Sequence, residues 1–313
     1  MTTRLLLCLA ALAVSMSAAD VKTGVAGRNI STITIRSESL NADRNVNVLL
    51  PLDYAHSTRR YPVLYLLHGL GDDHTAWAFM TDLSGYAARF GIIIVMPDAS
   101  RSWYVNSAAD PAAKFEDFIA KDLITYVDSH YRSIPLRRAR AVSGLSMGGY
   151  GAMFLGLKYA GRFGAIGAFS GALAMAHGAP APLQPNATEE ARKRMEQMMA
   201  LFGAPDSGDR KARDPFVLLE TVPAGQMPLL YIACGGQDFL LKQNRDFVDL
   251  LSSKKIAYEY REVSPRVHSW DFWDDQIAIF LNLLARTPGF DMRQPGPAPI
   301  PGPAPQPGPA PGD

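Results

Sequence analysis

The chain has 313 residues, with 31 lysines and arginines against 30 aspartates and glutamates, for a formal net charge of +1. This near balance argues against nucleic acid or an anionic membrane as the main partner, because both are bound through clustered positive charge. Hydrophobic residues make up 48% of the chain, which is ordinary for a soluble globular protein and excludes general disorder.

The N-terminal segment differs in composition from the body of the chain. Residues 1–19 combine an early cation, Arg4, an apolar run from Leu5 to Val14, and small residues before Asp20. This is the pattern of a secretory signal peptide, and its apolar run is too short to span a hydrocarbon layer of about 30 Å. The sequence therefore predicts a secreted or periplasmic protein without a membrane span.

The C-terminal segment is dominated by proline. Residues 291–313 hold nine of the 23 prolines, one at every second position from Pro295 onward. A segment with few amide donors and few apolar side chains cannot join a sheet or a core, so we expect an extended, solvated tail. The predicted folded domain spans 20–290, where Cys234 is the only cysteine and an internal disulfide is therefore excluded.

Apolar runs alternate with helical patterns through the middle of the chain. Alternating polarity predicts an antiparallel hairpin at Ile30–Arg36 and Val46–Leu50. Further strands are predicted at Val63–Leu67, Ile92–Met96, Arg140–Ser143, Ala165–Phe169, Leu229–Ala233 and Tyr258–Val263. Helices are predicted at Ala76–Arg89, Ala113–Tyr131, Met147–Tyr159, Glu189–Phe202, Phe239–Ser252 and Trp270–Arg286. This alternation indicates an α/β fold with a mostly parallel sheet covered by helices on both faces.

Residues 171–226 interrupt the alternation. They contain six prolines and no convincing strand, with one helix near Glu189–Phe202. An insertion between strands of an α/β sheet often lies over the site at the carboxyl ends of the strands. We interpret this segment as a cap, with a solvated surface excursion as the alternative.

The segment Gly144-Leu145-Ser146-Met147-Gly148 matches the pattern G-x-S-x-G. It follows an apolar strand and opens a helix of small residues, which is the setting that a nucleophile elbow requires. Glycines on both sides let the strand and helix pass closely, so that the serine hydroxyl projects above the sheet. The pattern predicts Ser146 as a nucleophile.

A serine hydroxyl needs a base, and in this type of fold the order along the chain is Ser, then acid, then His. Two histidines follow Ser146, and of these His268 lies in the loop between the last strand and the last helix, whereas His177 lies in the cap. Asp238 follows the strand Leu229–Ala233 and is the predicted acid. The predicted triad is therefore Ser146, Asp238 and His268.

Two backbone amides are expected to stabilise the oxyanion. One is that of Met147, at the start of the helix after Ser146, and the other is that of Leu70, in the glycine-containing loop after Val63–Leu67. His68 lies beside this loop and either lines the site or makes a hydrogen bond in the core. The histidines show no metal-ligand spacing and no phosphate-binding loop is present, so neither a metal nor a cofactor is expected.

Six motifs resemble, in order, those of the esterase D/putative esterase group of α/β-hydrolases. They are HGLGDDHTAW, WYVNS, EDFIAKDLITYVDSHYR, GLSMGGYGA, CGGQDFLLKQNRDFVDLL and HSWDFWDDQ. This group includes feruloyl and acetyl-xylan esterases, tributyrin esterases, S-formylglutathione hydrolases and mycolyltransferases. The resemblance implies an α/β-hydrolase fold and the same five site residues, and it implies that Trp103 and Tyr104 line the acyl pocket, where a packing role is the alternative.

Taken together, these features predict a secreted serine carboxylesterase that acts on short-chain, acetyl or feruloyl esters of sugars or small alcohols. Its substrate is expected to be a small molecule or an ester linked to a polysaccharide. An acyltransferase with the same triad is one alternative. A non-enzymatic surface or carbohydrate-binding protein on a hydrolase scaffold is another. The sequence does not define the oligomeric state.

Overall fold

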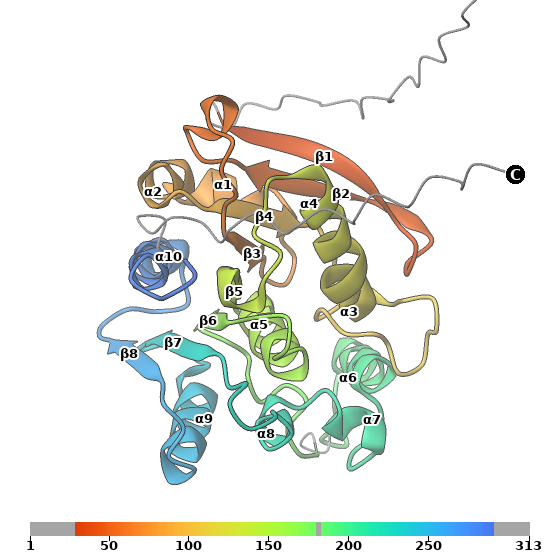
Figure 1. Ribbon diagram of the computed structural model, residues 1–313. Helices are drawn as coiled ribbons and strands as arrows, with labels where there is room; N and C mark the ends of the chain where they lie inside the picture. The colour runs from red at the N-terminus through yellow and green to blue at the C-terminus, as the bar shows by residue number, and fades with distance from the viewer. Residues whose placement is uncertain (1–28, 180–182, 291–313) are drawn as a thin grey trace, which may run out of the picture.

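The computed structural model describes residues 29–179 and 183–290, so the predicted signal peptide and proline-rich tail lie outside the described residues. Eight strands form one sheet in the order β1-β2-β4-β3-β5-β6-β7-β8 (Figure 1). The strands are β1 (Ile30–Ser37), β2 (Ala42–Leu49), β3 (Val63–Leu67), β4 (Ile93–Pro97), β5 (Arg140–Leu145), β6 (Ala165–Phe169), β7 (Leu229–Gly235) and β8 (Glu259–Val263). The pairs β1–β2 and β2–β4 are antiparallel and all later neighbours are parallel, which confirms the predicted mostly parallel sheet.

Helices cover both faces of this sheet. They are α1 (Ala76–Met80), α2 (Leu83–Phe90), α3 (Phe115–Asp117), α4 (Ile124–His130), α5 (Met147–Lys158), α6 (Glu189–Phe202), α7 (Gly208–Lys211), α8 (Pro215–Leu218), α9 (Leu241–Ser253) and α10 (Trp270–Leu284). In Figure 1, α2 and α10 lie on one side of the sheet, and α4, α5 and α9 lie on the other.

The side chains of β3 show why both faces are covered. Every residue of β3 is buried. Val63, Tyr65 and Leu67 belong to the core beneath α4, α5 and α9, whereas Leu64 and Leu66 belong to the core beneath α2 and α10. Because successive side chains of a strand point to opposite faces, an apolar run such as this one requires helices on both sides.

The predicted helix Ala76–Arg89 is two helices in the structure, α1 and α2. The break falls at Thr81 and Asp82. The Thr81 hydroxyl donates to the Trp77 carbonyl oxygen at 2.6 Å, and the Asp82 amide donates to the Asp274 carboxylate on α10 at 3.1 Å. The amide thus bonds to a distant helix instead of continuing its own, which the sequence pattern alone does not reveal.

The predicted helix Ala113–Tyr131 is also not a uniform α-helix. Its α-helical parts, α3 and α4, are joined by a π-helical segment, Phe118–Leu123. The boundaries of the remaining predicted helices and strands agree with the structure to within four residues, and the largest difference is at the start of β2, which begins at Ala42 and not at Val46.

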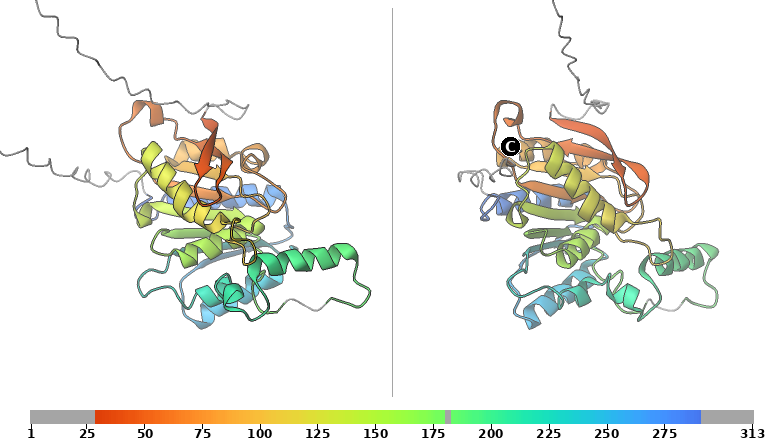
Figure 2. Two further views of the ribbon diagram at one scale, coloured as in Figure 1. Left: turned by 90° about the vertical axis from the view of Figure 1, so that its right-hand side faces the viewer. Right: turned by 45° about the vertical axis from the view of Figure 1, so that its right-hand side comes forward.

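The insertion between β6 and β7 contains α6, α7 and α8, and the described part of 171–226 holds no strand. The Thr188 hydroxyl caps α6 by accepting the Ala191 amide at 3.2 Å, and of the helix residues only Phe202 is buried. Figure 2 shows α6 projecting beyond the sheet and its covering helices. Across residues 29–179 and 183–290, no helix has the length and apolar character needed to cross a membrane.

Candidate active site

Ser146 occupies the sharp turn between β5 and α5. Its φ of 52° and ψ of −114° are values that residues other than glycine seldom adopt. A Cβ at Gly148 would lie 2.4 Å from the Leu67 carbonyl oxygen, and one at Gly144 would lie 2.7 Å from the same oxygen. Glycine at both positions therefore lets β5 and α5 pack against the end of β3, with Ser146 at the carboxyl edge of the sheet.

His268 and Asp238 are hydrogen-bonded to each other. The His268 Nδ1–H donates to Asp238 Oδ2 at 2.9 Å, and the Asp238 side chain is fully buried while 19% of the His268 side chain is exposed. The ring of Phe239 lies 4.6 Å from the His268 ring, and Phe239 lines the same cavity as Ser146. Three strand ends, those of β5, β7 and β8, thus bring Ser146, Asp238 and His268 to one edge of the sheet.

Ser170 and Trp273 support the Asp238–His268 pair. Trp273 Nε1–H donates to Ser170 Oγ at 3.1 Å, and the Trp273 ring stands edge-on to His268 at 4.8 Å between centroids. Burial alone would raise the pKa of Asp238. Hydrogen bonds from His268, Ser170 and the Leu240 amide outweigh burial and hold that pKa below its ordinary value. Asp238 is therefore an ionised acceptor for the imidazole N–H at neutral pH.

The two amides predicted for the oxyanion lie where the loops after β3 and β5 meet. Leu67 pairs with Gly144 in the parallel register of these strands. Leu70 lines the cavity that contains Ser146, and Met147 is the first residue of α5. In the described part of the chain, the loop and turn hydrogen bonds leave the Leu70 amide unused. The first amides of a helix also lack acceptors within it, so both positions can donate to an anion beside Ser146.

Ser146 opens into a cavity of about 710 Å³ between the sheet edge, the loop after β4 and the cap helix α6. The polar lining consists of Arg101, Ser107, Asp110, Ser146, Arg194 and Gln197. The apolar lining consists of Leu70, Trp103, Ala113, Ala172, Met175, Met198, Ala200, Leu201, Phe239 and Leu240. An enclosure of this size and character suits a small organic ligand with a mostly apolar part.

Trp103 lines this cavity, whereas Tyr104 and His68 lie in the core behind it. The Tyr104 hydroxyl donates to the His68 carbonyl oxygen at 2.9 Å. His68 Nδ1–H donates to the Gly69 carbonyl oxygen at 2.8 Å, and its Nε2 accepts the Ala99 amide at 3.1 Å. Burial lowers the pKa of His68 and keeps the ring neutral. His68 and Tyr104 thus connect the loops after β3 and β4. Neither side chain lines the cavity, and both act on it by holding these loops in place.

Hydrogen bonds fasten the cap to the body of the domain. Arg213 donates from Nε and Nη2 to the Asn106 carbonyl oxygen at 3.0 and 2.8 Å, and the Tyr150 hydroxyl donates to the Arg213 carbonyl oxygen at 2.5 Å. The Ala108 amide donates to the Leu201 carbonyl oxygen at 3.1 Å, at the end of α6. These contacts hold the cap against the loop after β4. The cavity at Ser146 lies between the cap and this loop.

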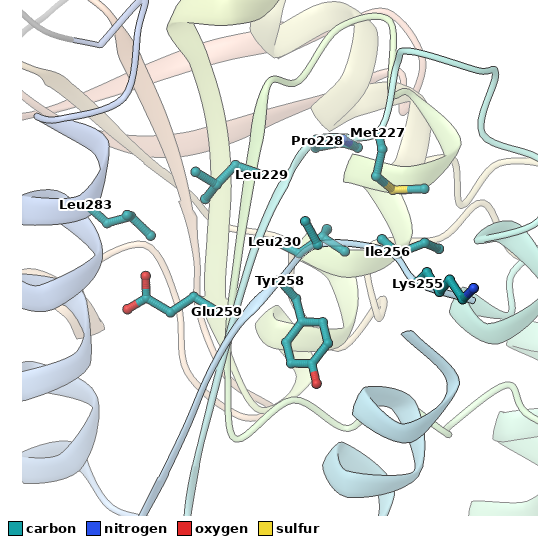
Figure 3. Close-up of a pocket in the computed structure, with 10 residues that line it drawn as sticks. Met227, Pro228, Leu229, Leu230, Lys255, Ile256, Tyr258, Glu259 and Leu283 are labelled. Atoms are coloured by element: carbon teal, nitrogen blue, oxygen red, sulfur yellow. The ribbon is translucent and has the colours of Figure 1, made fainter. Parts of the chain in front are cut away.

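A second cavity of about 700 Å³ lies at the opposite edge of the sheet, where β7 and β8 begin (Figure 3). It is lined by Met227, Pro228, Leu229, Leu230, Lys255, Ile256, Ala257, Tyr258, Glu259 and Leu283. Its lining contains no serine, cysteine or histidine and therefore offers none of these side chains as a nucleophile. The cavity at Ser146 has a similar volume but contains a serine. Within residues 29–179 and 183–290, no group of three or more His, Cys, Asp or Glu side chains could hold a metal ion.

Several residues at the site were not predicted from the sequence, among them Arg101, Ser170, Arg194, Phe239 and Trp273. Phe239 could have been selected because it adjoins Asp238 in the sequence. Trp273 lies within the quoted motif HSWDFWDDQ, and Arg101 lies two positions before Trp103, so both adjoin predicted residues. Ser170 and Arg194 reach the site only through the packing of distant segments, and no local pattern distinguishes them.

Comparison with known proteins places the chain among esterases. A family model described as "Putative esterase" matches residues 37–282. An acetyl esterase of Caldicellulosiruptor saccharolyticus is 29% identical over 259 residues, covering 80% of this chain and 95% of that protein.

Solved structures of serine hydrolases and esterases share the fold. FphF, a fluorophosphonate-binding serine hydrolase of Staphylococcus aureus, superposes with a TM-score of 0.69 at 26% identity, covering 81% of this chain and 97% of that one. A ferulic acid esterase superposes with a TM-score of 0.65 at 26% identity, covering 83% and 98%. The sheet order and these neighbours together identify the fold as an α/β-hydrolase.

Proposed function

The chain belongs to the putative esterase family and is an enzyme that hydrolyses carboxylic esters, and from this premise we propose that Ser146, His268 and Asp238 are its triad. The observation that carries the proposal is the 2.9 Å hydrogen bond between His268 and the buried Asp238, beside the cavity that Ser146 lines. A buried carboxylate that fixes the imidazole tautomer is what a serine hydrolase requires.

In the proposed reaction, His268 takes the proton of the Ser146 hydroxyl as its oxygen attacks the ester carbonyl. The amides of Leu70 and Met147 bind the oxyanion of the tetrahedral intermediate. His268 then gives its proton to the leaving alcohol, and an acyl-serine remains. In the second half, His268 activates water, whose oxygen adds to the acyl carbon and releases the carboxylic acid and free Ser146.

We propose acyl groups from acetyl to feruloyl, on sugars or small alcohols. The acetyl esterase and the ferulic acid esterase among the similar proteins support this range. The cavity also supports it, because Trp103, Met198 and Leu201 offer an apolar enclosure large enough for an aromatic acyl group. A panel of aryl esters of increasing acyl length, with feruloyl and acetylated-sugar esters, tests the range.

The Ser146→Ala variant tests the mechanism. It is expected to lose hydrolysis of p-nitrophenyl acetate and labelling by a fluorophosphonate probe, because both need the activated hydroxyl. Ser143→Ala is the matched control, since Ser143 is a fully buried serine on β5, the strand that leads to Ser146. Hydrolysis by Ser146→Ala at the wild-type rate would exclude the proposed nucleophile. An assay with excess acceptor alcohol distinguishes hydrolysis, which releases the carboxylic acid, from acyl transfer, which forms a new ester.

We also propose that the protein is exported, on the composition of residues 1–19. Expression of the full chain in a bacterial host is expected to give an exported protein whose mass corresponds to a start at Asp20. A full-length chain retained in the cytoplasm would contradict export.

A further inference from the structure

Two arginines, Arg101 and Arg194, line the Ser146 cavity. Arg101 lies in the loop after β4 and Arg194 lies on the cap helix α6, so separate segments bring positive charge to one cavity. Among the described residues, both arginines are exposed and neither guanidinium makes an ion pair or a side-chain hydrogen bond. The buried arginines of the cap differ, because Arg210 and Arg213 donate to backbone carbonyl oxygens.

The nearby carboxylates do not neutralise this pair. Asp110 is the only acidic residue of the lining, and its Oδ1 accepts the Ala112 amide at 2.9 Å. Glu190 precedes Arg194 by one helical turn and lines an adjoining cavity together with it, but the two side chains make no ion pair within the described residues. The lining of the Ser146 cavity therefore carries a net positive charge on an otherwise mostly apolar wall.

A guanidinium keeps its charge at all physiological pH values and presents donors in a planar fork that matches a carboxylate. Resting on the proposed esterase function, we propose that the preferred substrates carry a carboxylate, which Arg101 and Arg194 bind while Ser146 attacks the ester. The carboxylate takes no part in bond making. It orients the substrate, and the apolar wall accepts the rest of the acyl or alcohol group.

The carboxylate can belong to the acyl group, as in a half-ester of a dicarboxylic acid, or to the alcohol, as in an ester of a hydroxy acid. Two pairs of matched substrates distinguish these sources. On the acyl side, mono(4-nitrophenyl) glutarate is compared with 4-nitrophenyl 5-methylhexanoate, in which a neutral isopropyl group replaces the carboxylate. On the alcohol side, 3-acetoxybenzoate is compared with 3-acetoxybenzamide.

The test measures kcat/KM for all four esters with the wild-type protein and with a double variant, Arg101→Gln with Arg194→Gln. The wild type is expected to prefer the anionic member of at least one pair. The double variant is expected to lose about tenfold on that ester and less than about twofold on its neutral partner. Raising the ionic strength should reduce the wild-type preference, because salt screens exposed charges.

Arg192→Gln is the matched control. It removes the same charge from the same helix, but Arg192 donates to the Pro185 carbonyl oxygen and does not line the cavity. Equal kcat/KM for both members of both pairs, or equal losses on anionic and neutral esters in the double variant, would overturn the anion site. If the wild-type protein hydrolysed none of the four esters, the proposed hydrolysis itself would be overturned.

Discussion

The hydroxyl of Ser170 accepts the Trp273 indole N–H and helps to lower the pKa of Asp238, and Ser170→Ala removes both interactions. Ser170 is fully buried and accepts the indole N–H at 3.1 Å. Leaving a buried donor unpaired costs about 1–3 kcal/mol, and a hydrogen bond to a charged group contributes about 1.5–3 kcal/mol. Because these effects share one hydroxyl and do not simply add, we expect the free energy of unfolding to fall by about 2–4 kcal/mol.

The effect on activity follows from the position of Asp238. With one donor fewer, the Asp238 carboxylate is less well oriented toward His268. We therefore expect kcat/KM to fall about tenfold, which corresponds to about 1.4 kcal/mol. We also expect the acid limb of the kcat/KM profile to move to higher pH, because the lost hydrogen bond is one of those that lower the pKa of Asp238.

The pH profile separates a positioning role from packing. Measurement of kcat/KM on p-nitrophenyl acetate across pH 4 to 9, with urea unfolding in parallel, gives both quantities. Ser143→Ala is the matched control, because its buried hydroxyl has no hydrogen-bond partner in the described residues. A Ser170→Ala enzyme that is less stable but has the wild-type profile and kcat/KM would refute the positioning role.

Three further predictions concern single positions. Gly148→Ala places a Cβ 2.4 Å from the Leu67 carbonyl oxygen, so thermal unfolding should show a loss of about 1–3 kcal/mol and kcat should fall as the turn shifts; an unchanged enzyme would contradict the close approach. Burial raises the pKa of Cys234 to about 12, so the native thiol should resist iodoacetamide at pH 8 by intact mass, and stability should fall as the pH rises past about 9 more than in Cys234→Ala. Phe239 is 76% exposed and packs on His268, so Phe239→Ala should leave stability within about 0.5 kcal/mol but raise KM for aryl esters, and an unchanged KM would assign it no substrate contact.

The order of strands and helices could be predicted because each parallel strand is buried on both faces. Such a strand is a short apolar run, and Val63–Leu67 and Ala165–Phe169 were predicted with the boundaries that the structure has. Interruptions within helices could not be predicted. The break at Asp82 depends on a hydrogen bond to Asp274, which lies 192 positions further along the chain. Local periodicity contains no information on such a contact.

Some residues at the strand ends could likewise be predicted from the sequence, and others could not. Ser146, Asp238 and His268 could be selected because the elbow requires nearby glycines and because carboxyl ends of parallel strands meet at one edge. Whether they act as a triad is tested by the variants above. The positions of His68 and Tyr104 could not be predicted, because their hydrogen bonds join loops that only the folded sheet brings together.

The wall of the cavity is the part least accessible from sequence, and the reason is physical. The elbow needs glycines at fixed positions around Ser146, so a short motif between an apolar strand and a helix of small residues is sufficient to recognise it. The cap helix α6 is positioned by hydrogen bonds from the loop after β4 to its last turn, among them that from the Ser107 hydroxyl to the carbonyl oxygen of Ala200, 93 residues further along the chain. A change at these contacts can move Arg194 relative to Ser146 without altering the elbow. Substrate preference can therefore diverge among esterases that share the same nucleophile turn, and experiments on the cap will define the substrate more directly than experiments on the triad.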